Sequence, residues 1–170
     1  MLTLGIDPGT AVTGFGVVAS GGTGAYALVE CGVIRTTPSA PLATRLREIH
    51  EEVAALIGRH RPDCVAVEDV FYAKNVRTTL VLGHARGVVL LAAEQAGITI
   101  VEYPPAEIKK AVTGTGGASK AQVQFMVAQL LRLRSAPEPA DAADGVAAAL
   151  AHVMSARFPA PAAPRVVRLG

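Results

Sequence analysis

Apolar residues recur with two different periods along the chain, and the change of period outlines the secondary structure. Near the N-terminus, three runs separated by the glycine-containing turns PGTA and SGGTG predict neighbouring antiparallel strands at residues 2–7, 13–19 and 25–36. Residues 64–69 form a β-branched run that is too short for a helix, and residues 98–103 resemble it; both predict strands. The chain is therefore expected to form five strands.

Apolar residues at helical spacing fill the segments between and after these strands. The predicted helices cover about residues 42–57, 77–96, 105–112 and 120–131, with a last one that begins near Pro139. Ser119 precedes Gln122 by three positions, which is the spacing of a capping box and predicts the start of the fourth helix.

This order of elements predicts an α/β domain. Three antiparallel strands come first, then helices alternate with two more strands, and helices follow. We expect a mixed five-stranded sheet, with three antiparallel strands and then two parallel ones, flanked by helices. Residues 1–157 should form this domain, and the Pro/Ala-rich residues 158–170 should form a weakly ordered tail.

Length and composition agree with one domain. The chain has 170 residues, of which 51% are hydrophobic, and this is ample for a folded core. The longest apolar runs are broken by Gly, Pro or charges, so we expect no membrane span of roughly 20 residues. The N-terminus does not resemble a secretion signal, which predicts a cytoplasmic protein. Cys31 and Cys64 lie in strand-like segments and are expected to be inert thiols.

Two glycines interrupt the long predicted helix at residues 77–96. Gly83 and Gly87 lie one turn apart, and each costs helix stability, about 1 kcal/mol relative to Ala. We therefore expect a close neighbour that needs the space, and a second subunit would supply one.

Four acids are the strongest candidates for chemistry. Asp7 and Glu68 end strands, and Asp141 and Asp144 lie three apart on one face of a helix. Asp69 should point away from Glu68, because strand residues alternate in direction. Each acid alone is explained by a turn or a helix cap, but four together would repel one another unless a cation is present. Hard oxygen ligands favour Mg²⁺ or Mn²⁺, and two such ions suit phosphodiester hydrolysis.

Four sequence blocks, LGIDPGT, VEDVFYAKN, GTGGASKAQVQ and DAADGVAAALAH, resemble the RuvC family of Holliday-junction resolvases in order and spacing. The resemblance covers residues 1 to about 156. It implies a ribonuclease H-like fold, a homodimer, and metal-dependent, symmetric incision of two strands at a four-way DNA junction, leaving a 5′-phosphate and a 3′-hydroxyl. It also implies a branch-migration motor as a partner.

The resemblance makes the four acids a set with predicted roles. Asp7 should bridge two metal ions, and Glu68 and Asp144 should hold them from either side. Asp141 should complete the shell or orient the attacking water.

Residues expected to contact DNA surround these acids. Phe71 matches an aromatic residue of the family and would stack on an unpaired base, although packing against the core is the alternative. Lys74 and Arg77 suit phosphate, and Asn75 would bind backbone or base. Lys109 and Lys120 are expected on or beside helix starts, where backbone N–H groups favour phosphate.

Three other functions compete with a junction resolvase. An aspartate followed by Gly-Thr after a first strand also occurs in actin-like and sugar-kinase ATP-binding domains, but those need a second domain that 170 residues do not supply. A non-catalytic junction-binding protein would not require all four acids. A ribonuclease H-type enzyme that cuts RNA in hybrids would share the acids but not the VFYAKN block.

Overall fold

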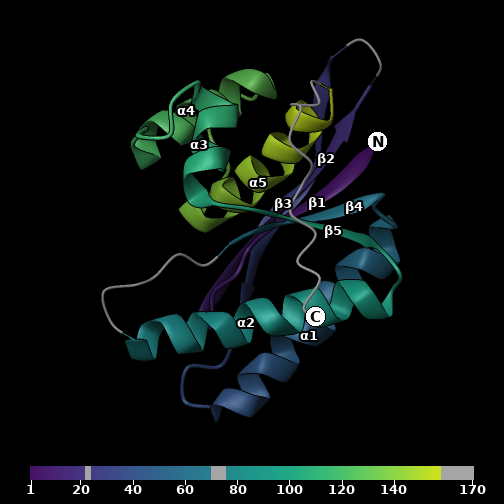
Figure 1. Ribbon diagram of the computed structural model, residues 1–170, viewed down its shortest axis with the longest axis vertical. Helices are drawn as coiled ribbons and strands as arrows, with labels where there is room; N and C mark the ends of the chain where they lie inside the picture. Colours follow the sequence, from purple (N-terminus) through teal and green to yellow (C-terminus); the bar gives the residue numbers. More distant parts are fainter. Residues whose placement is uncertain (22–23, 70–75, 158–170) are drawn as a thin grey trace, which may run out of the picture.

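A five-stranded mixed sheet forms the centre of the computed structural model, which describes residues 1–21, 24–69 and 76–157 (Figure 1). The strands are β1 (Leu2–Asp7), β2 (Val12–Ser20), β3 (Tyr26–Arg35), β4 (Cys64–Glu68) and β5 (Thr99–Tyr103). Their order across the sheet is β3-β2-β1-β4-β5. β1, β2 and β3 pair antiparallel, while β4 and β5 extend the sheet in parallel. The predicted mixed sheet is confirmed.

Helices cover both faces of this sheet. They are α1 (Leu42–His60), α2 (Val76–Gln95), α3 (Pro105–Thr113), α4 (Lys120–Leu130) and α5 (Ala140–Arg157). α1 and α2 lie on one face, and α3, α4 and α5 lie on the other (Figure 1). The predicted capping box is present at the start of α4: the Gln122 N–H donates to the Ser119 hydroxyl, and the Ser119 N–H donates to the Gln122 side chain.

Each face of the sheet has its own apolar core, because successive strand residues point to opposite faces. On β1, Leu4 and Ile6 contribute to the core shared with α1 and α2. Gly5 and Asp7 alternate with them and face α5. The second core lies under α3, α4 and α5, and its fully buried residues include Val18, Val127, Val146 and Leu150. The catalytic candidate Asp7 thus belongs to the α5 side of the sheet.

Helix α5 rests almost backbone to backbone on β1 and β2. A Cβ atom added to Gly14 would lie 1.8 Å from the carbonyl oxygen of Asp141. One added to Gly145 would lie 2.5 Å from the Cα of Phe15, and one added to Gly5 would lie 2.2 Å from the carbonyl oxygen of Gly145. No larger side chain fits at these positions. The glycines therefore fix the first turns of α5 directly above the end of β1.

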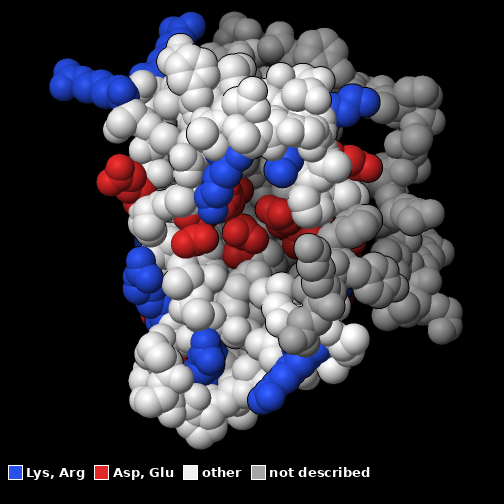
Figure 2. All heavy atoms as spheres, turned by 90° about the vertical axis from the view of Figure 1, so that its left-hand side faces the viewer, with Lys and Arg blue, Asp and Glu red and all other residues white. Residues whose placement is uncertain are grey.

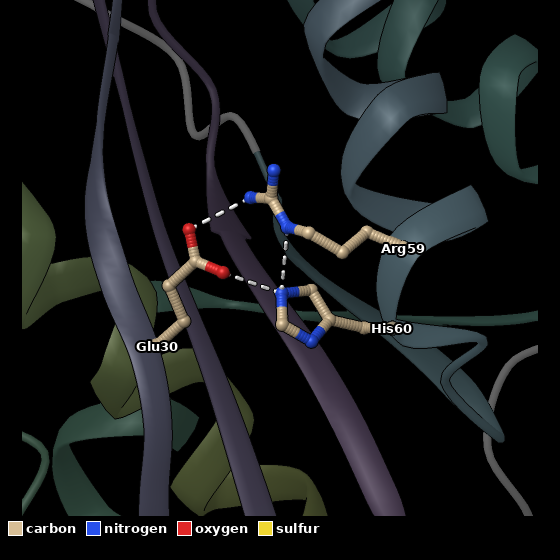
Figure 3. A network of polar contacts seen from close by, with 3 residues as sticks. All are labelled: Glu30, Arg59 and His60. Atoms are coloured by element: carbon tan, nitrogen blue, oxygen red, sulfur yellow. Dashed lines mark hydrogen bonds and ion pairs between the residues drawn. The ribbon is translucent and has the colours of Figure 1, made fainter.

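The other face is tied to the sheet by a polar network at the end of α1 (Figure 3). Arg59 donates from Nη2 to Oε1 of Glu30 on β3 at 2.7 Å. Nε2 of His60 lies 2.5 Å from the other oxygen of the same carboxylate. One acid on the edge strand thus holds the last turn of α1.

Helix α2 carries apolar residues on its outer side as well as its inner side. Its buried residues contact the core shared with α1: Ala85, Val89, Ala92 and Ala93. On the outer side, Val76 is 76% exposed and Leu80 is 61% exposed. A Cβ added to Gly83 or Gly87 would meet nothing within 4 Å. The predicted close neighbour of these glycines is therefore not found among the described residues.

The expectation that no segment is long enough to span a membrane does not hold for α2. By length and composition alone, its 20 residues are sufficiently apolar, with a mean hydropathy of 1.3 over the window. One such helix is weak evidence for a membrane, because core helices pass the same test. In this fold the inner side of α2 packs on the core, and its outer side forms the surface described above.

Two further predictions concern the cysteines and the tail. Cys31 and Cys64 are free thiols, as expected. The tail predicted for residues 158–170 lies outside the described residues.

The contact between α5 and β2 predicts a sharp difference between two glycine substitutions. Gly14→Ala should destabilise the protein by about 3 kcal/mol or more, because the new methyl group overlaps the Asp141 carbonyl. Gly58→Ala, in α1 with nothing within 4 Å of its added Cβ, should stabilise it by about 0.5–1 kcal/mol. Urea unfolding followed by circular dichroism measures both values. Equal effects at the two positions would contradict the close approach of α5.

Candidate active site

Three carboxylates meet where β1 ends below the first turns of α5. Asp7 is the last residue of β1, and Asp141 and Asp144 lie near the start of α5. One ligand oxygen from each of the three lies within 4.8 Å of the others. Asp7 pairs with Gly14 in the sheet, and the backbone of Asp141 lies directly over Gly14. The close packing of α5 therefore brings the three acids together.

Glu68 approaches the same place from β4, which lies beside β1 in the sheet. It is not part of the group of three, but it lines the same cavity, which has a volume of about 220 Å³. The residues that line this cavity are Asp7, Glu68, Pro105, Ile108, Lys109, Lys120, Val123, Asp144 and Ala147. Figure 2 shows acidic side chains gathered at the middle of this face, with basic side chains directly above them.

The carboxylates of this cavity are hard to ionise together. Burial, followed by the charges of Asp144 and Asp141, raises the pKa of Asp7 to about 7. Burial, followed by the charges of Asp7 and Asp144, raises the pKa of Glu68 to about 7. Two of the four acids therefore have pKa values near neutrality, which is a feature of functional sites.

Two lysines supply positive charge to the cavity. Nζ of Lys120, the first residue of α4, lies 2.7 Å from Oδ2 of Asp144. This hydrogen bond is the largest cause that raises the pKa of the Lys120 ammonium. The charge of Lys109 on α3 lowers the pKa of Glu68, against the stronger effect of burial. Both lysines line the cavity, so an anion that enters would meet them together with the acids.

The donor set suits a hard divalent cation. Three partly buried carboxylates converge within 4.8 Å, and burial together with their mutual repulsion raises the pKa of Asp7. Carboxylate oxygens are the ligands that Mg²⁺ and Mn²⁺ prefer. A bound cation would replace this repulsion with attraction, so the residues present fit a metal centre.

The structure places the other predicted site residues in different ways. Lys120 begins α4, as expected, but Lys109 lies one turn inside α3, which begins at Pro105. The helix begins at Pro105 as predicted, but the prediction that Lys109 lies on or beside its start is wrong, because Lys109 is one turn further along the helix. Arg77 lies in the first turn of α2. Phe71, Lys74 and Asn75 lie outside the described residues.

Sequence reasoning overlooked the glycines that position the acids. Gly14 and Gly16 lie two apart on β2 and therefore share the face of the sheet that contacts α5. Gly5 and Asp7 share the same face of β1 by the same rule. Glycines repeated at this spacing in two adjacent strands are the signal that could have predicted a helix in close contact.

The fold and the site together are those of a protein with a ribonuclease H-like fold and a group of carboxylates that could hold a metal ion. A family model described as "Crossover junction endodeoxyribonuclease RuvC" matches residues 3–152. The protein of that name from Pelotomaculum thermopropionicum is 51% identical over 152 residues, which are 89% of this chain and 92% of the relative. The chain belongs to the RuvC family of crossover junction endodeoxyribonucleases, a metal-dependent nuclease family.

Two solved structures of RuvC from Thermus thermophilus resemble this fold closely. One, described as "Thermus thermophilus RuvC structure", has a TM-score of 0.86 and 40% identity, and the match covers 92% of this chain and 96% of that chain. The other, "T. thermophilus RuvC in complex with Holliday junction substrate", has a TM-score of 0.85 and 36% identity, with 94% and 97% covered. That relative binds a Holliday junction with a domain of nearly the same shape.

The raised pKa of Asp7 predicts a pH-dependent gain in stability when it is replaced. An acid with a raised pKa in the folded state favours folding below its unfolded pKa of about 4, and this contribution is lost as the pH rises towards 7. Without metal, Asp7→Asn should therefore be about 2 kcal/mol more stable than wild type near pH 8 and equal to it near pH 4. Thermal unfolding in EDTA measures this difference.

Glu52→Gln, which changes an exposed acid of α1, is the matched control and should leave stability unchanged at both pH values. A gain for Asp7→Asn of the same size near pH 4 and pH 8 would show that ionisation of the buried Asp7 carboxyl is not its cause.

Proposed function

We propose that this chain resolves four-way DNA junctions by paired, symmetric, metal-dependent nicks that leave a 5′-phosphate and a 3′-hydroxyl. The observation that carries the proposal is the group of three carboxylates beside Lys120 in an open cavity, at the position where the RuvC family blocks converge. Membership of the family supports the choice of a branched DNA substrate over linear DNA.

The proposed metal ions are Mg²⁺ or Mn²⁺, two for each active site. When bound, they would activate a water molecule and stabilise the leaving oxygen of the phosphodiester. In this scheme Asp7 would be a ligand common to both ions, and Glu68 and Asp144 would each help to hold them. Asp141 would complete the ligand set or orient the attacking water. The central place of Asp7 is supported by its pKa, which burial raises most and the charges of both Asp144 and Asp141 raise further.

Lys109 and Lys120 are assigned to the phosphate that is cut. Both line the cavity with the acids, so a phosphate near the carboxylates would lie within reach of two positive charges. The further proposed contacts are Phe71 with an unpaired base, and Lys74, Asn75 and Arg77 with the DNA beside it. The branch-migration motor stays a prediction that rests on the family resemblance.

The stripe on the outer side of α2 supports a homodimer. Val76, Leu80, Gly83, Gly87 and Leu91 recur at helical spacing on the side opposite the buried residues. Large apolar residues at the ends and glycines in the middle allow another helix to approach closely. A second copy of this chain is the proposed occupant, because paired nicks at a symmetric junction require two active sites.

The function is tested with labelled four-way junctions, linear duplexes and RNA–DNA hybrids in Mg²⁺ or Mn²⁺. The wild-type chain should nick two opposite junction strands symmetrically. Asp7→Asn should lower the cleavage rate by about 10³-fold, because it removes a shared metal ligand, and should leave junction binding within about twofold. Glu52→Gln is the matched acid-to-amide control and should cut at the wild-type rate.

Three results would contradict the proposed function. If linear duplex were cut as fast as the four-way junction, the enzyme would not be specific for branched DNA. Preferential cutting of hybrids would favour a ribonuclease H-type enzyme. Junction binding by wild type without cutting in either metal would favour a non-catalytic junction-binding protein.

The dimer is tested by placing a charge in the α2 stripe. Leu80→Glu should raise the dimer dissociation constant by about 100-fold or more, because a carboxylate would be buried without a partner. Analytical ultracentrifugation measures this change, and junction nicks made at low protein concentration should become single rather than paired.

Phe125→Glu is the matched control, because Phe125 is 62% exposed on α4, on the other face of the sheet. It should leave the dissociation constant unchanged. If Phe125→Glu raised the dissociation constant more than Leu80→Glu did, the subunit contact would not lie on α2.

A further inference from the structure

A cluster of three charges lies on the face of the sheet opposite the active site. Nε of Arg86, on α2, donates to Oε1 of Glu102 on β5 at 2.6 Å, and a second nitrogen of the same guanidinium contacts the same oxygen. Nε of Arg86 also lies 3.4 Å from Oδ1 of Asp69. The side chains of Arg86 and Glu102 are 27% and 19% exposed, so this pair is shielded more than an ordinary surface pair, whereas the side chain of Asp69 is 41% exposed.

The cluster adjoins the strand end that carries Glu68. Glu68 pairs with Tyr103 at the ends of β4 and β5, and the N–H of Asp69 donates to the Tyr103 carbonyl at 2.8 Å. Because strand residues alternate in direction, Asp69 points towards α2 while Glu68 points into the cavity. The residue next to Glu68 is thus held by its backbone to β5 and by its side chain to α2.

Arg86 is the group that makes this arrangement stable. Its planar guanidinium contacts two carboxylates, Glu102 on β5 and Asp69 directly after β4, which a lysine ammonium could not do with the same geometry. Without that charge, Asp69 and Glu102 would lie close together with no counter-ion in the cluster and would repel each other. The strand end would then keep its backbone hydrogen bond to β5 but lose its side-chain tie to α2, and the neighbouring Glu68 would be held less firmly.

We propose that Arg86 is a positioning residue: it ties α2 to the carboxyl end of β4 and so fixes the direction of the Glu68 carboxylate from the opposite face of the sheet. This inference rests on the proposed function of Glu68 as a metal ligand. It assigns Arg86 no contact with DNA or metal. Arg86 acts through Asp69, which faces away from the cavity.

The central variant is Arg86→Met, assayed well below its unfolding temperature. Single-turnover cleavage of a four-way junction in Mg²⁺ should fall by about 10-fold, because small misplacements of a catalytic group are costly. Junction affinity should stay within about twofold, since the phosphate contacts are untouched. Calorimetric titration of the DNA-free protein with Mn²⁺ should show weaker binding by several-fold, and Arg86→Lys should recover part of both losses.

Arg47→Met is the matched control, because Arg47 pairs at 2.9 Å with Glu51 on the exposed side of α1, away from the active site. It should change neither cleavage nor Mn²⁺ affinity. Asp69→Asn tests whether Arg86 acts through Asp69. Alone, this change should slow cleavage. Combined with Arg86→Met, it should add little, because both changes break the contact between Arg86 and Asp69.

The inference is overturned if folded Arg86→Met cuts at the wild-type rate and binds Mn²⁺ with wild-type affinity, since Arg86 would then be structural only. It is also overturned if the effects of Arg86→Met and Asp69→Asn are independent. Failure of the wild-type chain to cut junctions would instead count against the proposed function, and the Mn²⁺ titration would still test Arg86.

Discussion

The direct contact of α5 with β1 and β2 is the constraint on which the active site depends. Gly14 and Gly145 leave no room for a side chain between helix and sheet. The first turn of α5 therefore lies over the end of β1, and Asp141 and Asp144 reach Asp7 without any loop to position them. A site built on rigid elements in this way keeps its geometry before a ligand arrives.

This packing has an electrostatic cost, which explains the charge pattern around the cavity. The contact forces carboxylates together in a partly buried place, and the pKa values of Asp7 and Glu68 rise to about 7 in response. Lys120 offsets part of the repulsion through its ion pair with Asp144. Without a bound cation, the remaining repulsion between the carboxylates lowers the stability of the folded protein. Functional sites commonly carry such a cost in stability.

Much of the fold was predictable from local patterns, because strand alternation, helical spacing and the Ser119 capping box are signals within short segments. The spatial proximity of Asp7 and Asp141 could not be predicted in this way, since no local rule relates residues so distant in sequence. Only the family resemblance indicated that the four acids belong to one site. The pairing of Arg86 with Glu102 was missed for the same reason. The start of the helix at Pro105 was predicted correctly, but Lys109 lies one turn inside that helix rather than at its start.

Anomalous diffraction from crystals soaked in Mn²⁺ would show whether the acids at the end of β1 form a metal centre. We expect anomalous density between the carboxylates of Asp7 and Asp144, with the Lys120 ammonium withdrawn from Asp144. If saturating Mn²⁺ leaves no density at these acids and the Lys120–Asp144 pair stays intact, the acids do not form a metal centre.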